Sequence, residues 1–101
     1  MRTRLELQTL LEDIAESQNV YFQPPESLRM QYPAIVYSLN RIDNHHANNS
    51  VYFQNNSYQI TVIDKDPDSE LVRKVSRLPM CRHDRSYSAD NLYHCVFTIY
   101  F

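Results

Sequence analysis

The chain has 101 residues and contains no glycine, and this absence limits both its turns and its chemistry. Glycine lets a backbone turn with positive φ or approach a ligand closely. The phosphate-binding P-loop, the dinucleotide-binding fingerprint and the nucleophile elbow of hydrolases all depend on it. The sequence therefore excludes these glycine-dependent motifs. Turns must instead use asparagine, aspartate, proline and serine, which tolerate left-handed backbone or fix φ.

Length and charge indicate one globular domain, which we assign to residues 1–101. The formal net charge is −2, whereas a nucleic-acid-binding domain usually carries a basic stripe and a pI above about 9. We therefore expect no specific nucleic-acid binding. No apolar run approaches the ~20 residues of a membrane span, and the first residues lack the apolar segment of a signal peptide. We therefore expect that the protein does not associate with a membrane and that it is synthesised in the cytoplasm.

Two segments have helical patterns. Thr3 and Glu6 form a capping box, and apolar residues then recur at helical spacing in a helix expected to end near residues 17–19. A second helix is expected to start in the acidic segment 66–70, with an acidic cap and acids near the positive end of the helix dipole. Pro79 is expected to end it.

Alternating or apolar runs indicate strands at residues 20–22, 34–40, 57–64, 82–88 and 92–101. The predicted order is α-β-β-β-α-β-β. Strands joined by short loops pair antiparallel, and the helices should cover one face. The sequence therefore predicts an α+β fold with a mainly antiparallel sheet, two helices packed on one face and a long β-hairpin. The last strand is apolar on both sides and is expected either to be central in the sheet or to be covered on both faces.

Residues 40–56 form the polar end of that hairpin. Six of them are asparagine, and residues 51–53 are expected to begin the return strand. Tyr52 and Phe53 are hard to explain as core residues beside so polar a segment, and tyrosine is enriched in protein interfaces. We therefore select this hairpin as a candidate partner interface, with seven residues: Arg41, Asp43, His45, His46, Asn49, Tyr52 and Phe53.

Three groups of side chains resemble metal ligands, but their spacing argues against a site at any of them. Asp64, Asp66 and Asp68 alternate as in a calcium loop, yet serine stands at the glycine position of such a loop and Val75 at its bidentate glutamate position. A strand exit followed by a helix cap explains them better. The adjacent His45 and His46 point to opposite sides of a strand, so they are a poor chelate.

The third group is a candidate zinc set of two cysteines and two histidines. A turn at residues 89–90 would place Cys95 opposite Asp84 and Cys81 opposite Thr98, so the cysteines would be offset by about 10 Å along the strand. Zinc ligands must all lie within about 2.3 Å of one ion. The same offset disfavours a disulfide. We therefore expect no metal and no cofactor at these four residues: Cys81, His83, His94 and Cys95.

No arrangement of serine, histidine and aspartate identifies a nucleophile with its base, so we expect that the protein is not an enzyme and has no catalytic residues. Several sequence phrases do resemble those of a known group. The chain from about residue 20 onward resembles the small tail-completion proteins of long-tailed bacteriophages and prophages, which include tail terminators and head–tail joining proteins. The resemblance is carried by residues 32–37 (YPAIVY), 58–64 (YQITVID), 66–69 (DPDS), 78–81 (LPMC), 89–94 (ADNLYH) and 97–101 (FTIYF).

The resemblance implies a structural protein of the virion tail at the head–tail junction. Members form a ring, commonly of six copies, that ends tail-tube polymerisation and joins the tail to the head connector. The expected partners are thus further copies of this chain, the tail-tube protein and the connector or adaptor. DNA would pass through the lumen without specific binding, which net negative charge would favour. Tail terminator and head–tail adaptor both stay open, and the alternative is a cytoplasmic ligand- or protein-binding regulatory module with a ferredoxin-like fold.

Overall fold

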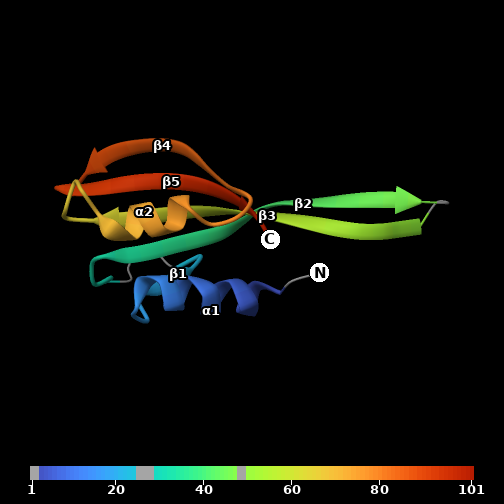
Figure 1. The fold of residues 1–101 in the computed structure, drawn as a ribbon, viewed down its shortest axis with the longest axis horizontal. Coiled ribbons are helices and arrows are strands. Elements are labelled where there is room, and N and C mark those ends of the chain that lie inside the picture. The colour runs from blue at the N-terminus through green and yellow to red at the C-terminus, as the bar shows by residue number, and fades with distance from the viewer. Residues whose placement is uncertain (1–2, 25–28, 48–49) are drawn as a thin grey trace.

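The computed structural model describes residues 3–24, 29–47 and 50–101, and for residues 41–47 and 50–55 it describes the backbone alone. Within these ranges the chain forms two helices and one five-stranded sheet (Figure 1). The elements follow the predicted order α-β-β-β-α-β-β, which confirms the α+β fold. They are α1 (Arg4–Ala15), β1 (Val20–Phe22), β2 (Ala34–Ala47), β3 (Ser50–Asp64), α2 (Glu70–Ser76), β4 (Cys81–Ala89) and β5 (Leu92–Tyr100).

The strands lie in the order β1-β2-β3-β5-β4. The pairs β2–β3, β3–β5 and β5–β4 are antiparallel, while the short β1 pairs parallel with β2. Parallel pairing needs a crossover connection rather than a tight turn, and the segment between Phe22 and Ala34 supplies it. β5 lies between β3 and β4, so it is an interior strand, which is one of the two arrangements expected from its two apolar sides.

Both helices pack on one face of the sheet. Leu7 and Leu11 of α1 and Leu71 and Val75 of α2 are buried against it. Register explains which sheet residues they meet, because residues directly opposite each other on paired strands share a face. Burying this set from water is the main favourable contribution to folding. The sheet residues of this core are Val20, Ile35, Tyr37, Tyr58, Ile60, Val62, Phe97 and Ile99.

A polar contact attaches α1 to the sheet beneath it. The Tyr37 hydroxyl donates to Oε1 of Gln8, whose Nε2 donates to the Val20 carbonyl at 3.1 Å. The Arg4 guanidinium donates to the Tyr37 oxygen at 3.3 Å and lies 4.6 Å from the centre of the Phe22 ring. Burial raises the pKa of Tyr37 because it disfavours the charged phenolate. The contact fixes the position of α1 along β1 and β2.

The helix ends differ in part from the sequence prediction. Thr3 caps α1 as expected, its hydroxyl accepting from the Glu6 amide at 3.2 Å. The helix ends at Ala15, earlier than expected, because Glu16 adopts left-handed backbone with φ 54°. The acidic cap predicted for α2 is wrong: Ser69 caps this helix and accepts from the Val72 amide at 3.4 Å.

The β4–β5 turn corrects a predicted register. The turn consists of Asp90 and Asn91, which both have positive φ, 53° and 62°, as the favoured two-residue hairpin turns require. These residues supply the backbone geometry that glycine usually supplies. The predicted register, centred on residues 89–90, was wrong because the turn is centred one residue later, and Cys95 lies opposite Ser86 instead of Asp84.

Candidate functional site

The strongest candidate site is the outer part of the β2–β3 hairpin. β5 pairs with β3 only from Ser57 to Asp64, and β1 pairs with β2 only at residues 35–37. The pairing of β2 with β3 continues well beyond both, to Ala47 opposite Ser50. Residues 41–47 and 50–56, here called the arm, therefore form a two-stranded ribbon that projects from the sheet (Figure 1).

The arm determines the shape of the molecule. The Cα positions extend 52 Å along the longest axis but only 26 and 23 Å along the other two. The arm occupies one end of the long axis, and both helices lie beside the sheet at the other (Figure 1). A two-stranded hairpin without a third strand or a helix is only marginally stable in water. Among the described residues, the backbone of the arm is thus paired only within its own two strands.

The base of the arm has a bulge in β2 and a buried serine in β3. The β2–β3 register shifts between Leu39 and Arg41, so Asn40 is an extra residue of β2. Bulges bend a strand and increase its twist, and this one lies where the ribbon leaves the sheet. Ser57 is buried there, and the Phe101 amide donates to the Asn56 carbonyl at 2.9 Å. The last residue of the chain therefore holds the arm at its base.

The predicted interface residues lie on the arm, as its two strands contain six of the seven. Asn49 lies outside the described residues. The backbone register places Asp43 opposite Asn55 and His45 opposite Phe53. A second register shift, between His45 and His46, leaves Tyr52 as an extra residue of β3. The six predicted residues on described strands are Arg41, Asp43, His45, His46, Tyr52 and Phe53.

A second polar surface lies on β4, and sequence reasoning missed it. The β4–β5 register shifts between His83 and Arg85, so Asp84 is an extra residue of β4. Its carboxylate accepts from the Thr98 hydroxyl and, at 3.1 Å, from Nε of Arg82. The Thr98 hydrogen bond, with Arg82 as a smaller cause, lowers the pKa of Asp84. Alternation alone could not locate this bulge, because it shifts the pattern by one residue.

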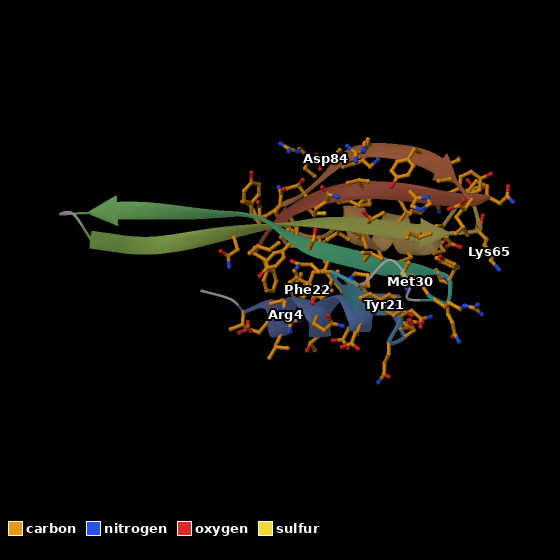
Figure 2. The ribbon with its side chains drawn as sticks, turned by 180° about the vertical axis from the view of Figure 1, so that it is seen from behind. Arg4, Tyr21, Phe22, Met30, Lys65 and Asp84 are labelled. Carbon is orange, nitrogen blue, oxygen red and sulfur yellow. The ribbon has the colours of Figure 1, made fainter. Side chains whose placement is uncertain are left out.

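An aromatic pair lies farther along the same surface. Tyr87 of β4 stacks on His94 of β5, with ring centres 4.7 Å apart and planes 10° from parallel. The guanidinium carbon of Arg85 lies 5.9 Å from the centre of the Tyr87 ring. A cation–π contact such as that of Arg85 with Tyr87 is worth roughly 0.5–1 kcal/mol at an exposed site. Figure 2 shows this face of the sheet, the one not covered by α2, with Asp84 at the β4 edge.

The two cysteines lie farther apart than the sequence indicated. Cys81 lies opposite Ile99, four residues along β5 from Cys95, which corresponds to about 13 Å at the usual strand rise. Burial raises the pKa of Cys81 to about 11. The Cys95 thiol instead accepts a hydrogen bond from Ser86, whose hydroxyl lies 2.8 Å from Nε2 of His83. No group of three metal-ligating side chains occurs among the residues that the structure describes.

The acidic segment 64–68 is a turn that leads into α2. Asp64 accepts from the Asp66 amide at 3.1 Å, and Asp66 accepts from the Asp68 amide at 2.9 Å. Aspartate side chains commonly bond the backbone two residues on in this way. The structure therefore agrees with the interpretation of these carboxylates as a strand exit.

The described structure contains several open pockets on its surface. One pocket has a volume of about 700 Å³ and lies where the β4–β5 turn meets residues 30–32. Its walls combine the charged side chains of Lys65 and Asp90 with a few apolar ones.

Among the described residues, no helix is long and apolar enough to cross a membrane.

Comparison with models of known protein families and with curated proteins finds no match for this chain.

Proposed function

We propose that this chain is a structural protein of a long-tailed bacteriophage that forms a ring at the head-proximal end of the tail tube. There it would end tube polymerisation and join the tail to the head connector. The observation that carries the proposal is the arm, a ribbon of largely polar sequence that projects from the sheet with no third strand beside it among the described residues. A ribbon of this kind gains stability when a neighbouring molecule covers it.

Charge and sequence phrases support the same proposal. The net charge of −2 provides few cations to hold phosphates, so DNA could slide past the ring without binding to it. The phrases that resemble those of tail-completion proteins lie mainly in the sheet and in the segments that connect its strands. The virion tail is accordingly the proposed location, and further copies, the tube protein and the connector are the proposed partners.

The experiment is to follow a labelled copy into assembled tails. Tails are isolated from phage-producing cells that express the labelled chain, and the label is located along the tail by electron microscopy. We expect the label at the head-proximal end only. A label that never occurs in assembled tails contradicts the proposal.

A graded pair of shortened chains tests the role of the arm. Replacing residues 43–55 by Asn-Gly joins the opposed Ile42 and Asn56 through a favoured turn, and we expect this chain to fold but to be absent from tails. Replacing only residues 45–53 by Asn-Gly, between the opposed Asn44 and Gln54, should give a chain that is incorporated into tails in an intermediate amount. Full incorporation of both variants would show that the arm is not the contact.

A further inference from the structure

β4 forms one edge of the sheet and is exposed along nearly its whole length. It pairs with β5 on one side and ends the strand order on the other, and residues 82–89 are all exposed. The opposite edge, β1, contains only three residues. The unpaired N–H and C=O groups of a long edge strand can bind another strand. β4 is therefore the longer of the two strands that end the strand order, and another strand could add along it.

The bulge at Asp84 changes which residues of β4 share a face. Side chains alternate along a regular strand, but Asp84 bonds Thr98 and Arg85 approaches Tyr87, so Asp84 and Arg85 lie on the same face. Arg82, Asp84, Arg85 and Tyr87 thus lie on the face opposite the helices. The other residues of β4 lie on the helix-covered face, because they are opposite residues of β5 on that face. They are Cys81, His83, Ser86 and Ser88, opposite Ile99, Phe97, Cys95 and Tyr93 in that order.

This order of faces is the same in both directions from the midpoint between Asp84 and Arg85. Two copies of β4 can therefore pair antiparallel around a twofold axis at that midpoint, with every residue opposite one on the same face. Cys81 then lies opposite Ser88 of the second copy, and His83 opposite Ser86. An unbulged strand paired about a midpoint between two residues would place side chains from opposite faces against each other. The bulge makes this register possible.

The charges along β4 match in this same register. Asp84 of each copy lies opposite Arg85 of the other, so two opposite-charge pairs form across the axis. Arg82 lies opposite Tyr87, which suits a cation–π contact. Asp84 keeps its bonds to its own chain, because a carboxylate has about four acceptor positions. A shift of two residues would instead place Arg82 opposite Arg85.

We propose that β4 is a dimerisation edge that pairs antiparallel with β4 of a second copy about the Asp84–Arg85 midpoint. Charged residues and bulges on an edge usually keep strands apart. Here the charges and the bulge of β4 disfavour pairing with a strand of different charge order, but they are complementary to β4 of a second copy. The contact is isologous, whereas a ring uses heterologous contacts, so it goes beyond the proposed function. An edge contact of this size falls below about 1,000 Å² and should be a weak dimer.

Sedimentation equilibrium on the full chain tests the pairing by charge exchange. We expect a concentration-dependent dimer, which Arg85→Asp and Asp84→Arg each weaken roughly tenfold or more by opposing like charges. The double variant Asp84→Arg/Arg85→Asp restores the opposite-charge pairs and should restore the dimer. Arg73→Asp makes the same charge change on the exposed face of α2 and should leave the dimer unchanged.

Crosslinking tests the register with the natural charges in place. In a Cys95→Ser background, Ser88→Cys should give a covalent dimer on mild oxidation, because position 88 lies opposite Cys81 of the second copy. Ser86→Cys, which lies opposite His83, should not. A chain that stays monomeric, single charge variants that dimerise like the parent, or equal crosslinking at both positions would each overturn the inference. Circular dichroism on each variant serves as the control for folding.

Discussion

The inner and outer halves of β2 and β3 form one continuous ladder but have different surroundings. In the inner half, Tyr37 and Ile60 lie opposite each other, fully buried between the helices and the sheet. In the outer half, the same two strands form the arm, without a third strand beside them among the described residues. Strand pairing alone thus does not define the core. A second layer does, because it removes apolar side chains from water.

The largest expected effect comes from breaking the inner half. Phe97 lies opposite Ile60 and is 1% exposed, so Phe97→Ala should lower the free energy of unfolding by about 3–5 kcal/mol through lost burial and a cavity. Urea denaturation measures the change. Tyr100→Ala, in the same strand but 41% exposed, serves as the control. Equal losses for both variants would contradict a core that depends on the helix-covered face.

The next effect concerns the attachment of α1 to the sheet. Gln8→Ala removes both the acceptor for the Tyr37 hydroxyl and the donor to the Val20 carbonyl. We expect a loss of about 1–2 kcal/mol, because these part-buried groups lose their partners. Asp13→Ala, at an exposed position of the same helix, should change stability by less than about 0.5 kcal/mol. A loss as small for Gln8→Ala would show that apolar packing alone positions α1.

A smaller effect is expected at the bulge of β4. Thr98→Val removes the hydrogen bond to Asp84 and should cost about 1 kcal/mol near neutral pH. Because that bond lowers the folded pKa of Asp84, the stabilisation is present above the unfolded pKa of about 3.9 and is lost as pH falls through the folded value. The difference between parent and variant should therefore shrink on acidification.

Unfolding curves across the acid range measure that difference, and NMR titration should show a higher Asp84 pKa in the variant. A difference in stability that stays constant from neutral pH to below the folded pKa would mean that the Thr98 hydroxyl acts through packing and not through the carboxylate.

The smallest effect should come from the arm. Replacing residues 43–55 by Asn-Gly should change the free energy of unfolding by no more than about 1 kcal/mol, because a lone two-stranded ribbon adds little stability. The urea dependence of unfolding should decrease only slightly, since little buried surface is lost. A large loss of stability would show that the arm supports the sheet and would remove the contrast between the two halves of the hairpin.

Much of the fold could be predicted because local patterns and tertiary packing agree. Leu7 and Leu11 of α1 follow the helical spacing and are buried against the sheet, and Thr3 caps that helix as its hydroxyl indicated. The register of β4 and β5 could not be predicted. It depends on a turn of two positive-φ residues and on a bulge at Asp84, and neither changes the local hydrophobic pattern enough to be located. The hairpin was predicted, but its continuous pairing to Ala47 and Ser50 was not.

The sequence by itself determined the secondary-structure order, the absence of glycine-dependent sites and the polar character of residues 40–56. These follow from residue type and spacing, which act over a few neighbouring residues. Only the tertiary structure decided that Tyr37 and Tyr58 are core residues while Tyr93 and Tyr100 are exposed. It also decided where the ribbon leaves the sheet and which β4 side chains share a face. These features depend on which strands pair and where a helix covers them, and such contacts join residues far apart in the chain.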